Sequence, residues 1–151
     1  MNPIEFIGLF TNSRILDNRY IFKLDSKFFL GDSQTAELLQ KPATKPVYFK
    51  TYLGTEGRVF VPSFFLLELL KTHAQTAVIN TKSEWLFLCR RDILGEGVIK
   101  SGRLQEKEHV LVLNERSEVL GYGYYVGGKI RNLLDRGDFL RRERNNIRIK
   151  K

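Results

Sequence analysis

The stretch Val119-Leu120-Gly121-Tyr122-Gly123-Tyr124-Tyr125-Val126 decides how this chain is expected to fold. Its β-branched and aromatic residues favour a strand, because such side chains pack well on a pleated surface. Glycine stands at two alternate positions within it. Glycine inside a strand indicates a sharp bend or the close approach of a second backbone. The segment is therefore predicted to be a corner strand of a small closed sheet.

Other short apolar segments surround this strand at close spacing. Residues 84–89, 97–100 and 110–113 precede it, and residues 129–134 are expected to form a closing strand. Glycines punctuate the connections between these segments. Evenly spaced short strands with glycine turns are typical of a small β-barrel. A short turn or helix over residues 136–142 is expected to pack against the closing strand.

The first half of the chain alternates strand and helix signals. Polar and apolar residues nearly alternate over residues 19–24 and 47–53, which indicates half-buried strands. Turn residues at 54–57 precede a partner strand over residues 58–61. This half is therefore predicted to be an α+β unit with its own small core.

Two helices are expected in that unit. Ser33 has the side chain of a helix N-cap and is expected to begin a helix over residues 34–40. Pro62 and Ser63 are expected to open a second helix, which ends near Thr72. The apolar residues of this second helix predict a broad buried face.

The fold class predicted from these patterns is α+β, with two domains. An α/β domain over residues 1–80 is expected to end in a short strand and to pack on a β-barrel domain over residues 81–151. No linker rich in Gly, Ser or Pro separates them at residues 80–83. The two halves are therefore expected to pack together rather than to move freely.

Composition excludes several classes of protein. Hydrophobic residues make up 42% of the chain, which is enough for a core and excludes a disordered basic protein. The single cysteine excludes an internal disulfide framework and fits a reducing compartment. The apolar runs are far shorter than the ~20 residues of a membrane span, and residues 1–10 lack the pattern of an export signal. We expect a soluble cytoplasmic protein, or a nuclear or nucleolar one in a eukaryote, with no membrane partner.

Positive charge is concentrated at the carboxyl end. Residues 129–151 hold nine Lys and Arg against three acids, a surplus of six out of the net charge of +8. Such a surplus creates a local positive potential, and its natural partner is a polyanion whose counterions are released on binding. The alternative is a solvated basic tail that aids solubility.

The residues that carry most enzymatic chemistry are sparse here. Cys89 lies inside an apolar segment that is expected to be a strand, which indicates a packed thiol rather than a nucleophile. His73 and His109 are the only histidines, too few for a transition-metal site, and His109 is expected to be exposed. The glycines on either side of Glu96 lack the lysine of a phosphate-binding loop. We expect no enzymatic activity, no cofactor and no bound metal.

Several motifs of the second half resemble the PUA domain, a small RNA-binding barrel. The resemblance rests on the segments Glu84-Trp85-Leu86-Phe87-Leu88, Val110-Leu111-Val112-Leu113-Asn114, Val119-Leu120-Gly121-Tyr122-Gly123 and Asp135-Arg136-Gly137-Asp138-Phe139-Leu140-Arg141-Arg142-Glu143. The whole chain resembles the ribosome-biogenesis factor family of archaea and eukaryotes, in which a pre-PUA domain precedes a PUA domain. The first-half carriers are Tyr20-Ile21-Phe22-Lys23-Leu24, Tyr52-Leu53-Gly54 and the helix after Pro62.

This resemblance implies an RNA-binding face on the second half. The face comprises the loop after the first segment of the barrel and the closing strand with its following turn. The loop after the first segment includes Gly95 and Gly97. Lys100 and Arg103 border this glycine turn and are expected to extend the basic part of the face. The candidate RNA-binding residues are Arg90, Arg91, Lys100, Arg103, Lys129, Arg131, Arg136, Arg141 and Arg142.

Side-chain chemistry supports the same assignment. The adjacent Arg141 and Arg142 offer forked donors for phosphate oxygens, and guanidinium planes stack on unpaired bases. Tyr122, Tyr124 and Tyr125 are candidate stacking platforms, with packing inside the barrel as the alternative.

The leading hypothesis is a non-catalytic RNA-binding protein that binds ribosomal RNA during assembly of the large subunit, within pre-ribosomal particles that hold other assembly factors. One alternative is a protein-interaction adaptor whose first half recruits another assembly factor. Another is the targeting module of an RNA-modification enzyme. Reading of duplex DNA is disfavoured, because the sequence offers no evident recognition helix.

Overall fold

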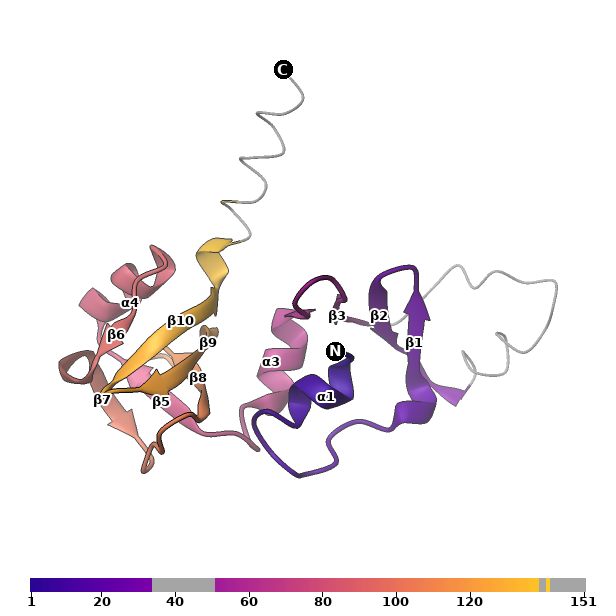
Figure 1. Ribbon diagram of the computed structural model, residues 1–151, viewed down its shortest axis with the longest axis horizontal. Coiled ribbons are helices and arrows are strands. Elements are labelled where there is room, and N and C mark those ends of the chain that lie inside the picture. The colour runs from indigo at the N-terminus through magenta and orange to yellow at the C-terminus, as the bar shows by residue number, and fades with distance from the viewer. Residues whose placement is uncertain (34–50, 139–140, 142–151) are drawn as a thin grey trace, which may run out of the picture. The chain divides into compact units, whose positions relative to one another are not determined.

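The computed structural model describes residues 1–33, 51–138 and 141. The chain divides into two compact units, Met1–His73 and Ala74–Lys151 (Figure 1). The predicted helix over residues 34–40 and residues 47–50 of the predicted strand lie outside the described residues, and so does Arg142. Within the described parts of the chain, no helix is both long enough and apolar enough to cross a membrane.

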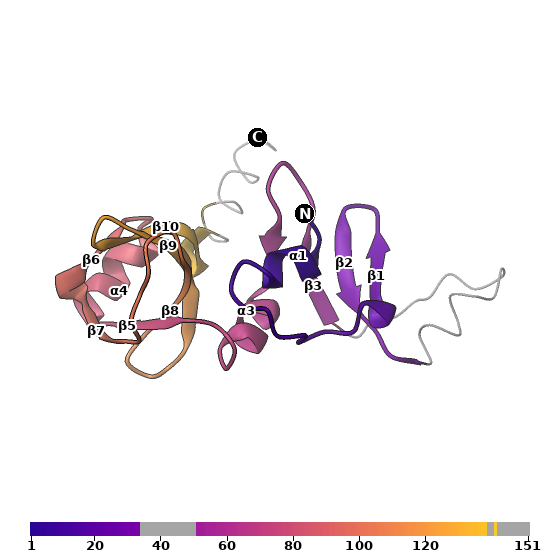
Figure 2. The ribbon, with the colours of Figure 1, turned by 60° about the horizontal axis from the view of Figure 1, so that its bottom comes forward.

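The first unit is built on a four-stranded antiparallel sheet with the order β1-β2-β3-β4. Its described elements are α1 (Pro3–Ile7), the 3-10 helix η1 (Asn18–Tyr20), β1 (Ile21–Leu24), β2 (Lys27–Leu30), β3 (Thr51–Thr55), β4 (Val61–Pro62) and α3 (Phe64–Leu70). Both views of the ribbon show α1 and α3 beside β3 (Figures 1 and 2). The apolar run before Gly31, which the sequence analysis did not assign, forms β2.

An aromatic cluster joins the helices of this unit to its sheet. The ring of Phe60 lies 5.3 Å from that of Phe6 in α1 and 6.1 Å from that of Phe28 in β2. The hydroxyl oxygen of Ser63 accepts a hydrogen bond from the Leu66 N–H (3.2 Å), so the predicted start of this helix is confirmed. Its buried face is narrower than predicted, because Phe65 is 41% exposed.

The second unit is a six-stranded sheet with the order β6-β10-β9-β8-β5-β7. Its elements are β5 (Thr76–Ile79), α4 (Thr81–Leu88), β6 (Ile93–Leu94), the 3-10 helix η2 (Gly95–Gly97), β7 (Val98–Ser101), β8 (His109–Leu113), β9 (Val119–Val126) and β10 (Lys129–Asp135). Only β5 and β8 among the paired strands run parallel. The first and last strands of the order, β6 and β7, are joined by η2 alone, so the sheet curls into a nearly closed barrel.

Two predictions about the start of this unit need correction. The strand expected at the end of the first half is β5, and it pairs with β7 and β8 in the second sheet. The division between the units accordingly falls between His73 and Ala74 rather than at residues 80–83. The strand predicted over residues 84–89 is the helix α4 instead.

The reason for the second error is local. The Asn80 side chain accepts a hydrogen bond from the Ser83 N–H (2.8 Å), which caps the helix N-terminus. A short apolar run does not distinguish a strand from a helix by its period. In α4 only Ser83 and Phe87 are buried, and Cys89 at its end is exposed rather than packed in a core.

The glycines of β9 allow β10 to approach closely. A Cβ atom on Gly121 would lie 1.9 Å from the carbonyl oxygen of Leu134, and one on Gly123 would lie 2.4 Å from a methyl carbon of Ile130. No side chain fits in that space, so the prediction of a close backbone approach at these glycines is confirmed. The contact holds the closing strand against the barrel.

We predict that Gly121→Ala destabilises the second unit by about 3 kcal/mol, because β10 has to move to admit the methyl group. The midpoint of urea unfolding measures this loss. Gly95→Ala is the control, since its Cβ would meet its nearest atom at 3.4 Å. Equal midpoints for the two variants would contradict the close approach.

Candidate nucleic-acid interface

The helix α4 ends in a turn that presents two arginines. The Arg90 N–H donates to the Phe87 carbonyl (2.9 Å), and the Arg91 N–H donates to the Leu86 carbonyl (3.0 Å). Arg90 has a φ of 66°, the left-handed conformation that helix ends of this type require and that glycine usually supplies. Both arginine side chains are exposed. The helix end therefore places two guanidinium groups in solvent, one of them on a strained backbone.

Asp92 fixes this turn to the closing strand β10. One carboxylate oxygen accepts a hydrogen bond from the Lys129 amine (2.8 Å), and the other accepts from the Asn132 N–H (3.1 Å). The hydrogen bond from Lys129, with further contributions from the Asn132 N–H and the charges of Lys129 and Arg131, lowers the pKa of Asp92. Asp92 therefore remains ionised and holds the turn next to residues 129–132.

The anchored turn carries two exposed arginines, and the part of β10 to which it is anchored carries a third. Arg91 directly precedes Asp92, and Arg131 directly precedes Asn132, whose N–H the Asp92 carboxylate binds. Arg131 is exposed on β10, opposite Tyr124 in the sheet. We call Arg90, Arg91 and Arg131 the arginine surface. The structure thus brings the two segments of the predicted RNA-binding face side by side.

Arg141 forms an ion pair with a second carboxylate, that of Asp135, within the fold. Asp135 is 1% exposed, and both of its oxygens accept hydrogen bonds from one terminal nitrogen of Arg141 (2.9 and 3.0 Å). The other terminal nitrogen donates to the Leu88 carbonyl (2.7 Å). The Asn132 amide donates to the Phe87 carbonyl (2.7 Å) and to Asp135 (3.1 Å). We call Asp135, Asn132 and Arg141 the Asp135 clasp.

The clasp corrects the role predicted for Arg141. Its guanidinium fork engages Asp135 and the Leu88 carbonyl, where a phosphate was expected. Gly137 belongs to the same arrangement, because a Cβ atom there would lie 2.3 Å from the Leu88 carbonyl oxygen. The acid, glycine and arginine of the carboxyl-terminal motif, Asp135, Gly137 and Arg141, therefore stabilise the fold at the end of α4.

The other predicted residues divide into engaged and exposed groups. Lys129 is bound to Asp92, and the Arg136 side chain donates to the Val119 carbonyl (2.6 Å). Lys100 and Arg103 are exposed, on β7 and in the connection that follows it. The remaining candidate, Arg142, lies outside the described residues.

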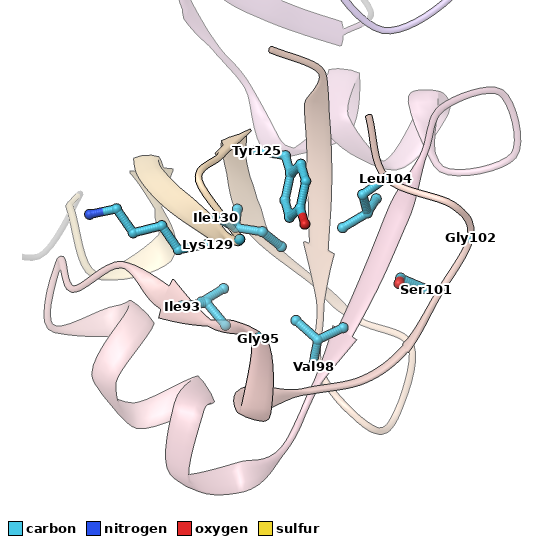
Figure 3. A pocket seen from close by; sticks show the side chains of 10 residues that line it. Ile93, Gly95, Val98, Ser101, Gly102, Leu104, Tyr125, Lys129 and Ile130 are labelled. Atoms are coloured by element: carbon cyan, nitrogen blue, oxygen red, sulfur yellow. The ribbon is translucent and has the colours of Figure 1, made fainter. Parts of the chain in front are cut away.

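A pocket of about 330 Å³ lies between the connection after β7 and the β9–β10 hairpin. Figure 3 shows the side chains of Ile93, Val98, Leu104, Tyr125 and Ile130 around its opening. Ser101 and Gly102 line one side, between Lys100 and Arg103 in the sequence, and Lys129 lines another. The pocket therefore lies between the Lys100–Arg103 segment and Lys129, and its lining combines apolar side chains with the hydroxyl groups of Ser101 and Tyr125, which suits a base with its flat ring and polar edge.

The tyrosines of β9 have different environments. Tyr122 is 7% exposed, and burial raises its pKa to about 12, so it belongs to the core. The ring of Tyr124 packs edge-on against His109 at 5.2 Å. His109 is half-buried rather than exposed, and burial lowers its pKa. Tyr125 remains a candidate base contact through the pocket that it lines.

Comparison with known proteins agrees with this architecture. Residues 75–144 match the family model of the UPF0113 PUA domain. A UPF0113 protein of Archaeoglobus fulgidus is 30% identical over 115 residues, which are 66% of this chain and 64% of that protein. The chain therefore covers less than two thirds of this curated relative's length.

A solved structure shows the same fold. A conserved PUA domain protein from Thermoplasma acidophilum superimposes with a TM-score of 0.51 at 13% identity, over 82% of this chain and 79% of that one. A hypothetical protein from Pyrococcus horikoshii gives a TM-score of 0.48 at 11% identity, over 76% and 72%. The second unit has a PUA domain fold, and PUA domains generally bind RNA.

Sequence reasoning missed Asp92 and Asn132, which position the interface without belonging to the basic surplus. The sequence does contain a signal for Asp92. An acid directly after two arginines lowers the local positive charge, which would weaken binding of an anion, so a structural role is the simpler explanation for it. No comparable signal marks Asn132, because its role depends on the pairing of α4 with β10.

We predict that Arg90→Gly stabilises the protein by about 1 kcal/mol, because glycine adopts this left-handed conformation without strain. The same change removes an exposed guanidinium and is expected to weaken RNA binding. Ser117→Gly is the control, since Ser117 also has a positive φ, of 62°. Thermal unfolding and RNA titration measure both effects. The assignment is wrong if Arg90→Gly lowers stability or binds RNA as tightly as the native chain.

Arg141→Ala is expected to cost about 3 kcal/mol of stability, because it leaves the buried Asp135 carboxylate without its cationic partner. This value is at the low end for broken buried pairs, since the Arg141 side chain is 36% exposed. Chemical denaturation measures the cost. Arg131→Ala, at an exposed position, is expected to change stability by less than about 0.5 kcal/mol. Similar losses in the two variants would show that Arg141 is not a structural residue.

Proposed function

We propose that this protein is a non-catalytic RNA-binding protein and that its PUA domain contacts RNA through the arginine surface. The observation that carries the proposal is the anchoring of the residue 90–92 turn to β10 by Asp92. This anchor holds the turn of Arg90 and Arg91 next to the part of β10 that carries Arg131, and all three side chains are exposed. An ordered group of arginines binds a flexible anion with less loss of conformational entropy than arginines on a mobile loop.

The chemistry of the arginine surface suits single-stranded RNA. Arginine presents forked donors to phosphate oxygens, and its planar group stacks on exposed bases. The nearest acid in sequence, Asp92, is bound to Lys129, so its charge is compensated locally. The pocket beside Lys129, lined by apolar side chains and by the hydroxyl groups of Ser101 and Tyr125, offers a place for an unpaired base next to these phosphate contacts.

We infer further that the RNA is ribosomal and that the protein acts in assembly of the large ribosomal subunit. The support is the order of the two units, because an α+β unit followed by a PUA domain resembles the pre-PUA and PUA arrangement of ribosome-biogenesis factors. The first unit is then the counterpart of the pre-PUA domain and the surface on which other assembly factors dock. This role places the protein in the cytoplasm, or in the nucleus or nucleolus of a eukaryote. Crosslinking in cells followed by sequencing of the attached RNA tests the ribosomal assignment.

Titration of the full chain with a single-stranded RNA oligonucleotide tests the arginine surface. We predict that Arg91→Ala with Arg131→Ala weakens binding by about tenfold or more, because two charged contacts are lost. The dependence of log K on log salt is expected to become shallower by about 0.7 for each phosphate contact removed. Thermal unfolding of the variant is expected to match that of the native chain, because both side chains are exposed.

Arg116→Ala is the matched control for this titration. Arg116 is an exposed arginine in the turn between β8 and β9, outside the arginine surface. Its removal is expected to leave the affinity and the salt slope nearly unchanged. Equal losses for Arg116→Ala and for the double variant would reduce the effect to net charge, and an unchanged affinity in the double variant would remove the proposed interface.

A further inference from the structure

The helix α4 presents an apolar face to solvent. Lys82, Trp85, Leu86 and Cys89 are all exposed, and their spacing places them on one side of the helix. Trp85 is 70% exposed, more than any other large hydrophobic side chain in the described residues, and Leu86 is 41% exposed. A neighbouring pair of exposed large apolar side chains of this kind indicates a binding surface.

Trp85 has no evident task in the folding of the second unit. The helix is held by Phe87, which is fully buried in the barrel core, and by the carbonyl contacts of the Asp135 clasp. Its N-terminus is capped by Asn80. Contacts along its buried face and at both of its ends thus hold α4 in place. The exposed indole is left available for a ligand.

Positive charges stand on both sides of this indole. Lys82 precedes Trp85 by one turn of the same helix face, and Arg90 and Arg91 follow where the helix ends. Trp85 lies about 4.5 Å along the helix axis from Leu88, the last residue of α4, and Arg90 and Arg91 follow two and three residues later in the turn. An aromatic plane between cations matches how proteins bind single strands, with bases stacked on rings and the backbone tracked by charge.

A groove next to Leu86 extends the same surface. It has a volume of about 400 Å³ between α4, β6 and η2. Its lining combines the apolar side chains of Leu86, Ile93 and Leu94 with polar and charged residues, namely Asn80, Lys82, Ser83, Asp92 and Glu96. The carboxylates of Asp92 and Glu96 disfavour a phosphate in the groove, so the groove suits the base side of a strand whose phosphates lie toward Arg90 and Arg91.

We propose that Trp85 is a stacking platform for an unpaired base of single-stranded RNA whose neighbouring phosphates contact Arg90 and Arg91. This inference rests on the proposed function and extends the arginine surface onto the outer face of α4. Charge complementarity and continuity with the arginine surface favour RNA as the occupant. Base-paired RNA does not fit the proposal, because its bases are already stacked on one another.

The protein carries a direct probe of this contact, because Trp85 is its only tryptophan. We predict that titration of the full chain with a single-stranded adenosine oligonucleotide quenches tryptophan fluorescence, saturating at the same concentration as binding measured by anisotropy of a labelled oligonucleotide. A duplex RNA of equal length is expected to quench it far less. Binding that leaves the fluorescence unchanged overturns the proposal.

Trp85→Ala is expected to weaken binding of the same oligonucleotide by roughly 5- to 150-fold, the range for loss of one base stacked on an aromatic ring. Its thermal unfolding and the salt dependence of its binding are expected to stay unchanged, since the side chain is exposed and uncharged. Trp85→Phe is expected to recover part of the affinity. Val59→Ala, at a 68% exposed apolar residue of the first unit, is the control and is expected to bind as the native chain does.

The outcomes separate this inference from the proposed function. If the arginine variants weaken binding and Trp85→Ala does not, the platform is wrong and the arginine surface stands. If no RNA binds the native chain, both proposals fail. If Trp85→Ala binds RNA normally but loses a protein partner that survives ribonuclease treatment, the α4 face is a protein-docking surface and the proposal is overturned.

Discussion

The end of α4 against β10 is the contact on which the interface depends. Near the end of the helix, the carbonyls of Phe87 and Leu88 accept hydrogen bonds from Asn132 and Arg141. Both donors are held by the buried carboxylate of Asp135. Because this clasp fixes the last turn of α4, it also fixes where the chain leaves the helix. The position of Arg90 and Arg91 therefore depends on this contact, although their side chains do not form it.

The positive charge at the carboxyl end therefore serves two purposes. Part of it completes the fold, since Arg141 neutralises Asp135, Lys129 neutralises Asp92, and Arg136 binds the start of β9. Another part, at Arg131, remains exposed next to a turn that contributes Arg90 and Arg91. Net charge alone does not distinguish these groups. The distinction depends on which acid lies within hydrogen-bonding distance, and that follows from the strand pairing.

The sequence predicted the barrel and its corner strand because glycine at positions 121 and 123 indicates a sharp bend or the close approach of a second backbone, and the structure shows the close approach. It also predicted the convergence of the residue 90–91 turn with β10. It failed at residues 84–89, where a short apolar run fits a strand or a helix equally and the Asn80 cap decided for the helix. The contacts of Arg141 and the exposure of Trp85 could not be predicted from the sequence. The first depends on the pairing of distant segments, and the second on which face of α4 is buried.

Beside the contact of α4 with β10, Asp92 is the residue that holds the turn of Arg90 and Arg91 on β10. Replacing it by asparagine removes a negative charge beside the arginine surface, and on charge alone RNA should bind more tightly. Loss of the charged contact to Lys129 loosens the turn, so we expect weaker binding instead, by several fold. Titration of Asp92→Asn with single-stranded RNA decides between the two. Weaker binding with an intact fold supports the anchored surface, and tighter binding contradicts it.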